Sequence, residues 1–255
     1  MDKHGKVSVT LVESVASISF SHPQSNCLTS RLLIELTHSI NNAALDKNVR
    51  VIVVRSEGEK SFCAGASFDE MLDIKDFKTG KEFFMHFARL LNEMRKCPKI
   101  IIARVHAKAV GGGVGIAAVS DYTMACNEAS IRLGDLALGL GPFVVGPAIE
   151  RKIGKTNFVT MSIDADWHDA FWAKQAGLFT KVFANKHDLD EAINTFAKKI
   201  SVCSTEAIAD MKKIFWEGTE NWDSLLEARA EISGKLVLSE FTKKYMKNFK
   251  SLKSK

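Results

Sequence analysis

Hydrophobic and polar positions alternate near the start of the chain and then change to a spacing of three and four. The alternation covers residues 7–12 and 15–20, and a period of two predicts the two strands of a β-hairpin. From residue 29 to 46 apolar side chains recur three and four positions apart, which predicts an amphipathic helix. The chain therefore begins with a hairpin followed by a helix that has one apolar face.

Two largely apolar runs follow, at residues 51–54 and 99–105, and such runs are typical of strands buried on both faces. A second helix is predicted over 80–96, between the two runs, and residues 61–66 are predicted to form a turn. A glycine turn, its helix and a strand at 122–125 repeat this order. Strands that alternate with helices indicate an α/β fold.

After residue 166 the pattern predicts only helices. We expect a core over residues 1–195 and a C-terminal helical region over 196–255, with no internal repeat and no low-complexity linker. Large apolar side chains in this part fit either contacts within the chain or contacts between subunits of an oligomer. The predicted helices cover 166–176, 189–202, 205–216, 223–237 and 239–249.

Composition places the chain among ordinary globular proteins. It has 255 residues, of which 46% are hydrophobic and 25% charged. No apolar stretch approaches the roughly 20 residues of a bilayer helix, and neither a signal sequence nor an Arg-rich leader opens the chain, so we expect a cytoplasmic location and no membrane partner. The five cysteines are scattered without a C-x-x-C pair, which indicates reduced, mostly buried thiols and no metal site.

The net charge of +5 is modest, but the C-terminal tail is strongly basic. A solvated helix face, a nucleic-acid arm or a site for a phosphate-bearing ligand would each explain it. After Glu240 the tail carries Lys243, Lys244, Lys247, Lys250, Lys253 and Lys255 and no acidic residue.

Two glycine turns are the main candidates for chemistry. Gly111, Gly112 and Gly113 lie between a strand-like and a helix-like segment, where glycines let backbone N–H groups approach a ligand and a helix N-terminus adds a positive field. Gly65-Ala66 follows an earlier predicted strand. If both turns lie at the carboxyl edge of one sheet, their N–H groups can converge to form an oxyanion hole. Two unrelated tight turns are the alternative.

A dinucleotide site is a weaker alternative. Gly113-x-Gly115-x-x-Ala118 matches the G-x-G-x-x-[GA] pattern, but residues 106–112 separate its first glycine from the preceding strand. No acidic residue stands at the spacing that binds the ribose, and no P-loop is present. Serine nucleophiles have no support, because Ser67 and Ser120 lack the G-x-S-x-G context.

At these residues the chain resembles the crotonase superfamily, the enoyl-CoA hydratase/isomerase family of enzymes that act on acyl-CoA thioesters. The resemblance implies a spiral of repeated ββα units and a helical C-terminal region that forms homotrimers, often paired into homohexamers. Its motifs are Pro23-x-x-Asn26-x-Leu28, the segment 62–71, the triple glycine with Asp121 behind it, and Leu138-Gly139-x-x-Pro142.

The resemblance also implies roles for particular residues. The backbone N–H groups of Ala66 and Gly112 would hold the thioester carbonyl oxygen as it becomes an enolate. Coenzyme A would enter as part of the substrate, with no separate cofactor and no nucleic acid, and Lys243, Lys244 and Lys247 become candidates to contact its phosphates. Substrate-binding positions would be Ala64, Gly65, Gly111, Gly113, Leu138, Gly139 and Pro142.

The chain departs from the family's pattern at one of its two catalytic glutamates. The first position is Gly115, and the second falls on Asp135, which becomes the candidate acid/base unless its carboxylate merely caps a turn. One base can move a double bond, whereas hydration calls for a second group, which Asp69 or Glu70 would have to supply. Isomerisation, hydration and non-catalytic acyl-CoA binding therefore all stay open.

Several other residues are considered on the same grounds. Asp121 and His106 are expected to be structural. The non-catalytic alternative for Asp69 and Glu70 is to stabilise the N-terminus of the helix that follows them. The family varies its acyl pocket between residues 73 and 96. Apolar candidates for the lining there are Phe77, Phe83, Phe84 and Phe87.

Overall fold

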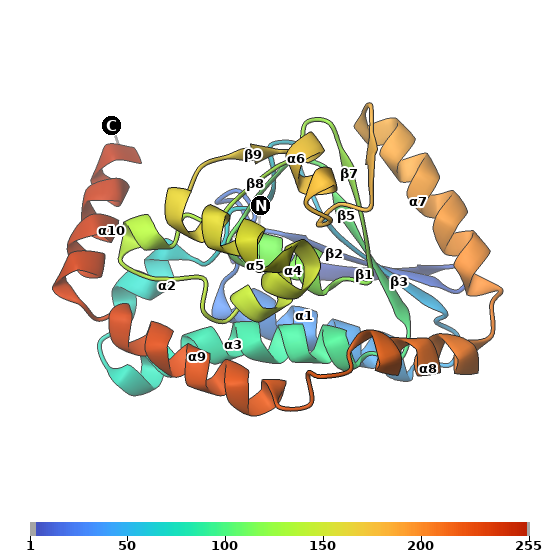
Figure 1. Cartoon of the computed structure of the whole chain (residues 1–255), viewed down its shortest axis with the longest axis horizontal. Coiled ribbons are helices and arrows are strands. Elements are labelled where there is room, and N and C mark those ends of the chain that lie inside the picture. Colours follow the sequence, from blue (N-terminus) through green and yellow to red (C-terminus); the bar gives the residue numbers. More distant parts are fainter. Residues whose placement is uncertain (1–3, 254–255) are drawn as a thin grey trace.

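Two β-sheets organise the chain in a computed structural model that describes residues 4–253 (Figure 1). The larger sheet has the order β1-β2-β3-β5-β7-β10, and the smaller one the order β4-β6-β8-β9. The strands of the larger sheet are β1 (Lys6–Val12), β2 (Val15–Ser21), β3 (Val51–Ser56), β5 (Ile100–Val105), β7 (Tyr122–Cys126) and β10 (Lys181–Phe183). Those of the smaller sheet are β4 (Ser61–Cys63), β6 (Lys108–Val110), β8 (Ser130–Arg132) and β9 (His168–Asp169).

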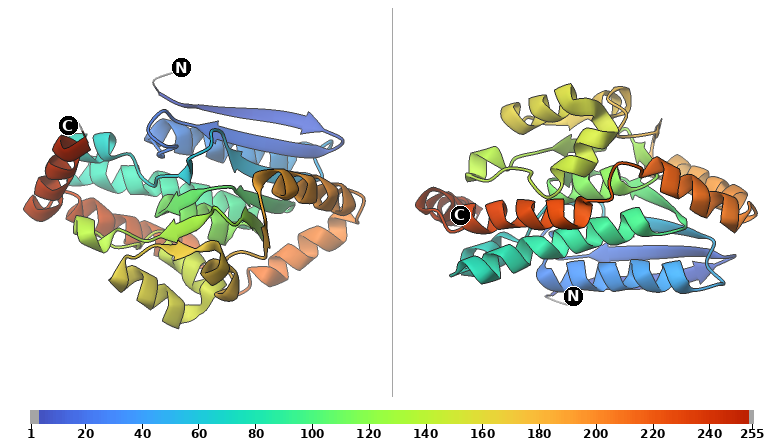
Figure 2. Two further views of the ribbon diagram at one scale, coloured as in Figure 1. Left: turned by 90° about the horizontal axis from the view of Figure 1, so that it is seen from above. Right: turned by 60° about the horizontal axis from the view of Figure 1, so that its bottom comes forward.

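Helices cover both sheets and form most of the C-terminal part. They are α1 (Ser30–Leu45), α2 (Phe68–Asp73), α3 (Phe77–Lys96), α4 (Gly112–Val119), α5 (Gly146–Asp164), α6 (Ala170–Gln175), α7 (Lys186–Ser201), α8 (Thr205–Phe215), α9 (Trp222–Leu236) and α10 (Glu240–Lys253), with a 3₁₀ turn η1 (Leu136–Leu138). In Figure 2, α9 runs along α3 and α10 stands at the end of the molecule. The predicted α/β fold class is thus confirmed.

The larger sheet is parallel except for its hairpin, and its central strands are buried on both faces. Ile52 and Val54 belong to the main core beneath α1, α3 and α4, whereas Val51 and Val53 pack with Leu189 of α7 and its neighbours on the other face. Successive side chains of a strand point to opposite faces, so a strand covered twice carries apolar residues at every position. The continuous apolar runs of the sequence were correctly interpreted.

Helix ends follow local capping. Helix α1 begins after Thr29, whose side chain accepts a hydrogen bond from the Leu32 N–H, in agreement with the predicted start. Helix α3 begins at Phe77, three residues before the predicted start, because Asp76 caps it. Helix α5 was not predicted from the sequence. Its backbone is kinked at Gly154, which has a φ of +77° and interrupts the helical spacing of apolar residues.

Two predictions of local structure were wrong. Residues 61–63 form strand β4 rather than part of a turn, because they pair with β6, a contact that lies 47 residues away along the chain. The chain after residue 166 is not purely helical, since β9 and β10 add edge strands to the two sheets. Short strands of this kind are defined by their partners, so their own sequence carries little signal.

The basic tail packs on the core through part of helix α10. The Lys243 ammonium donates to the carbonyl oxygens of Met71, Leu72 and Ile74 at 2.7–3.0 Å, at the C-terminal end of α2. Lys250 forms an ion pair with Asp69 at 2.6 Å, while Lys244 is exposed. Lys243 therefore fixes α10 to α2, and contacts of the tail with phosphates stay a prediction.

A buried ion pair joins the sheet to helix α8. Asp121 Oδ2 accepts from the Ile101 N–H at 2.8 Å and from Lys212 Nζ at 2.7 Å, and the side chains of Asp121 and Lys212 are 5% and 3% exposed. Asp121 is thus a structural hydrogen-bond acceptor, as the sequence predicted. Within residues 4–253, no helix is long and apolar enough to cross a bilayer.

Replacing Asp121 by Ala is expected to lower the free energy of unfolding by about 3–5 kcal/mol, because it leaves the Lys212 ammonium buried without its partner. Urea denaturation followed by circular dichroism measures the change. Asp210→Ala is the matched control: it removes the partner of Lys213 from an exposed pair and should cost about 0–1 kcal/mol. Equal losses in both variants would contradict the prediction.

Candidate active site

The two glycine turns follow adjacent parallel strands of the smaller sheet. Gly65-Ala66 comes after β4 and Gly111-Gly112 after β6, and these strands pair in parallel. The carboxyl ends of parallel strands meet at one edge, so the turns lie side by side there, as expected. The turns do not follow the two long buried strands of the larger sheet, β3 and β5, directly. They follow the short strands β4 and β6, which come after β3 and β5 in the chain.

Backbone geometry leaves at least one N–H group of each turn without an acceptor among residues 4–253. Gly65 has a φ of +86°, and its carbonyl accepts from the Leu28 N–H at 2.7 Å, while the Ser67 N–H donates to the Leu28 carbonyl. Between these bonds the Ala66 N–H has no acceptor among residues 4–253. Gly112 is the first residue of α4, where an N–H has no partner within its helix.

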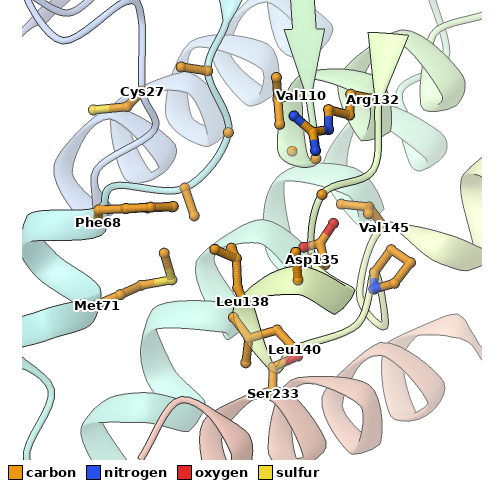
Figure 3. Close-up of a pocket in the computed structure, with 18 of the residues that line it drawn as sticks. Cys27, Phe68, Met71, Val110, Arg132, Asp135, Leu138, Leu140, Val145 and Ser233 are labelled. Atoms are coloured by element: carbon orange, nitrogen blue, oxygen red, sulfur yellow. The ribbon is translucent and has the colours of Figure 1, made fainter. Parts of the chain in front are cut away.

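One cavity of about 690 Å³ opens at this edge of the sheet (Figure 3). Its volume is in the range of ordinary ligand sites. Eight of the positions proposed from the sequence line it: Ala64, Gly65, Ala66, Gly111, Gly112, Asp135, Leu138 and Pro142.

Two proposed positions do not line the cavity. A Cβ on Gly113 would lie 2.6 Å from the Cβ of Cys63, so this glycine lets α4 pack on β4. Gly139 has a φ of +78°, and a Cβ there would lie 2.6 Å from the ring of Phe241 in α10. Both glycines serve close packing around the cavity.

Asp135 presents a carboxylate to this cavity from the turn after β8. Its Oδ2 atom is buried and accepts no hydrogen bond from residues 4–253, and its side chain does not cap η1. A Cβ on Gly111 would lie 3.9 Å from that oxygen, so the carboxylate stands close to the second glycine turn. Burial raises the pKa of the Asp135 carboxyl to about 6, since desolvation outweighs a hydrogen bond from its own backbone. Such a group exchanges protons readily near neutral pH.

The two other candidate carboxylates are held elsewhere. Glu70 accepts hydrogen bonds from the N–H and hydroxyl of Ser30 at 2.8 and 2.7 Å. It therefore stabilises the N-terminus of α1 and not that of its own helix, which Ser67 caps. Asp69 lines the cavity, but Gln24 and Lys250 bind its two oxygens. Glu70 does not line the cavity, so Asp135 is the one carboxylate of the three that faces the cavity with an oxygen that accepts no hydrogen bond from residues 4–253.

Val145 fills the place where a side chain on Gly115 would lie. A Cβ added to Gly115 would be 2.7 Å from Cγ1 of Val145 and 3.8 Å from Cδ2 of Leu91. Val145 itself lines the cavity beside Asp135 (Figure 3). This wall of the site is apolar because a valine from a separate loop packs onto a helix glycine.

Aromatic and aliphatic side chains make up much of the remaining wall. Phe84 and Phe87 of α3 line the cavity as expected, whereas Phe83 is core and Phe77 is 40% exposed beside Lys235. Lining residues that the sequence analysis missed include Phe68, Met71, Arg132, Trp167, Ser233, Tyr245 and Phe249. They come from distant segments, and the contact of Phe68 with Phe249, at 5.2 Å between ring centroids, carries no local sequence signal.

The dinucleotide alternative is wrong for a geometric reason. Gly113 and Gly115 lie inside helix α4 and face Cys63 and Val145, so a pyrophosphate has no room to approach them. His106 does not line the cavity; its ring is buried without a hydrogen-bond partner among residues 4–253, and burial lowers its pKa to about 4. It is a neutral histidine of the core, as expected.

Fold and site together define an α/β enzyme with free backbone N–H groups and one buried carboxylate in an apolar cavity. The sequence model described as enoyl-CoA hydratase/isomerase matches residues 10–254, so the chain belongs to that family. It has hydratase/isomerase-type activity on enoyl-CoA.

Named relatives agree with this assignment. The chain is 30% identical over 195 residues to a probable enoyl-CoA hydratase of Rhizobium meliloti, a match covering 76% of this chain and 74% of the relative. It is 26% identical over 251 residues to the short-chain-enoyl-CoA hydratase of Clostridium acetobutylicum, with coverage of 98% and 93%.

Solved structures share the fold. An enoyl-CoA hydratase from Bacillus halodurans superposes with a TM-score of 0.88 at 21% identity, covering 95% of this chain and 99% of the other. A putative enoyl-CoA hydratase from Mycobacterium avium paratuberculosis has a TM-score of 0.85 at 23% identity, with 97% coverage of both chains. The expected crotonase-type fold is thus confirmed.

Gly115→Ala is expected to destabilise the protein by about 1–3 kcal/mol despite the helix propensity of Ala, because the new methyl group collides with Val145. Val145→Ala in the same chain should recover most of that loss, which a double-mutant cycle of chemical denaturation measures. Additive losses in the double variant would show that Val145 does not fill the position.

Asp135→Asn is expected to stabilise the protein at pH 8. The folded-state pKa of about 6 lies above the ordinary 3.8, so the folded state binds the proton more tightly and stability falls as pH rises through that interval. The Asn variant escapes this loss, and its advantage should reach about 1–3 kcal/mol at pH 8 and vanish near pH 4. Thermal unfolding of both proteins across this pH range provides the measurement. A variant that is no more stable at pH 8 would contradict a buried, unpartnered carboxylate.

Proposed function

We propose that the enzyme shifts the double bond of an enoyl-CoA ester from C3 to C2, with Asp135 as the one acid/base. The observation that carries the proposal is that, of the three candidate carboxylates, Asp135 alone lines the cavity with an oxygen that has no partner among residues 4–253, while Val145 occupies the place where a side chain at position 115 would lie. A proton shuttle needs one base that can act twice, whereas addition of water needs a second group to orient and deprotonate it.

The geometry supports a simple order of events. The thioester carbonyl oxygen accepts from the N–H groups of Ala66 and Gly112, and the Asp135 carboxylate removes a proton from C2. The electron pair of that C–H bond moves into the C1–C2 bond and onto the carbonyl oxygen, where the two donors stabilise the negative charge. Asp135 then returns its proton to C4, and the double bond ends between C2 and C3.

The same cavity binds the substrate and holds the catalytic carboxylate in this proposal. Coenzyme A is a part of the substrate in this proposal, and the chain uses no further cofactor. Apolar walls suit an acyl chain and also keep water away from the carboxylate, which preserves its raised pKa. Ala64, Gly65 and Gly111 complete the edge on which the thioester lies.

The proposal extends to assembly and location. Exposed apolar side chains on α6 and α8, namely Phe171, Ile214 and Phe215, at 68%, 61% and 48% exposure, support association into a homotrimer or homohexamer. We also propose a cytoplasmic location for the enzyme.

Asp135→Asn is expected to lower kcat for a 3-enoyl-CoA by about 10²–10⁴-fold, since the amide cannot accept the C2 proton. The absorbance of the conjugated product measures the rate. Affinity for a saturated acyl-CoA should change less than about twofold, because Asp135 Oδ2 accepts no hydrogen bond within residues 4–253 that the substitution would break. In the wild type, kcat/KM should rise with pH and level off above an apparent pKa of about 6.

Two results would contradict the proposal. Undiminished turnover of the Asn variant would remove Asp135 from the chemistry. Hydration of crotonyl-CoA as fast as isomerisation would show that the site activates water without a second free carboxylate. Val145→Ala serves as a control for changes in shape, because it alters the same wall without removing the base.

A further inference from the structure

Helices α3 and α9 touch backbone to backbone at a pair of glycines. A Cβ on Gly80 would lie 2.8 Å from the carbonyl oxygen of Gly234, and a Cβ on Gly234 would lie 2.5 Å from the Lys81 N. Figure 2 shows α9 lying along α3. Side chains larger than hydrogen would push the helices apart, so these glycines bring α9 close to the cavity that α3 lines.

Ser233, the residue before Gly234, reaches the cavity as a result. It is 2% exposed and belongs to the cavity wall. In Figure 3 it lies below Leu140, at the end opposite Val110 and Arg132, with Asp135 between the two ends. Its hydroxyl donates to the carbonyl oxygen of Arg229 at 3.2 Å, so the side chain is held against its own helix.

The wall around Ser233 is apolar. Leu140 lies directly beside Ser233 in Figure 3. Met71 of α2 and Phe84 also line the cavity, and Phe84 stands one turn after Gly80 on the same face of α3. In the proposed function the thioester carbonyl oxygen lies at Ala66 and Gly112, and C2 to C4 lie beside Asp135. The rest of the acyl chain then extends toward the end of the cavity where Ser233 lies. A short side chain at position 233 sets the remaining depth.

We propose that Ser233 limits the length of the acyl chain that the cavity accepts, because the methyl end of the longest accommodated chain stops against it. This inference rests on one part of the proposed function, namely that the ligand is an acyl-CoA. It does not depend on which reaction the enzyme carries out. Each additional buried methylene should tighten binding about fourfold until the chain meets Ser233, after which affinity stops rising.

The test uses saturated acyl-CoA esters from butyryl to dodecanoyl, which bind without turnover, in isothermal titration calorimetry. For the wild type, we expect affinity to rise with chain length and then level off. Ser233→Leu extends the floor by about 1.5 Å, one C–C bond, and should move that limit to a chain shorter by one or two carbons. At the former limit the Leu variant should bind at least tenfold more weakly, while butyryl-CoA binds within twofold of the wild type.

Two further substitutions at the same position separate size from polarity. Ser233→Ala removes the hydroxyl without adding volume and should keep the limit at the wild-type length. Ser233→Val adds less volume than leucine, so it provides a milder variant, with at least a threefold loss at the former limit. Ser224→Leu is the matched control, because Ser224 is exposed on the same helix, and its binding series should follow the wild type.

An unmoved limit in both the Leu and Val variants overturns the proposal. A uniform loss at every chain length, butyryl-CoA included, also overturns it, since that result assigns Ser233 to packing alone. Failure of the proposed reaction is distinguishable: a wild type that binds the series as described but does not isomerise a 3-enoyl-CoA contradicts the isomerase and leaves the role of Ser233 intact.

Discussion

The parallel pairing of β4 with β6 is the constraint on which the site depends. Each strand has only three residues, yet their alignment places Gly65-Ala66 and Gly111-Gly112 at one sheet edge. The neighbouring strand β8 delivers Asp135 to the same edge. Three parallel strands thus bring together groups that lie as far apart in sequence as Ala66 and Asp135, each on the turn that follows its strand.

The apolar cavity and the raised pKa of Asp135 have a common origin. Side chains that would attract an acyl chain also remove water from the carboxylate, and no cation lies among the causes of its shift. An unpartnered carboxylate charge in an apolar cavity lowers the stability of the fold. The same surroundings make the carboxylate more basic.

Close helix packing shapes two parts of the cavity wall. Small residues permit close approach at two places: Val145 packs against Gly115, and the backbones of α3 and α9 meet at Gly80 and Gly234. The same physical feature therefore leaves no room for a side chain at position 115 in one wall and brings Ser233 of α9 into another part of the cavity lining.

Local patterns in the sequence were enough for the hairpin, helices α1 and α3, the strands buried on both faces and the two glycine turns. Each of these depends on short-range periodicity or on the conformational freedom of glycine. The resemblance to a family added Asp135 and the role of Ala66. Strand β4, helix α5 and the edge strands β9 and β10 escaped, because partners or a kink define them more than their own residues do.

By itself the sequence determined which residues could do chemistry: a glycine at 115, an aspartate at 135 and two turns rich in glycine. Only the tertiary structure decided which of them are free to act. It paired Glu70 with Ser30, Asp69 with Lys250 and Asp121 with Lys212, and left Asp135 Oδ2 unpartnered within residues 4–253. The availability of a carboxylate depends on neighbours brought from distant parts of the chain, and linear spacing does not encode those distances.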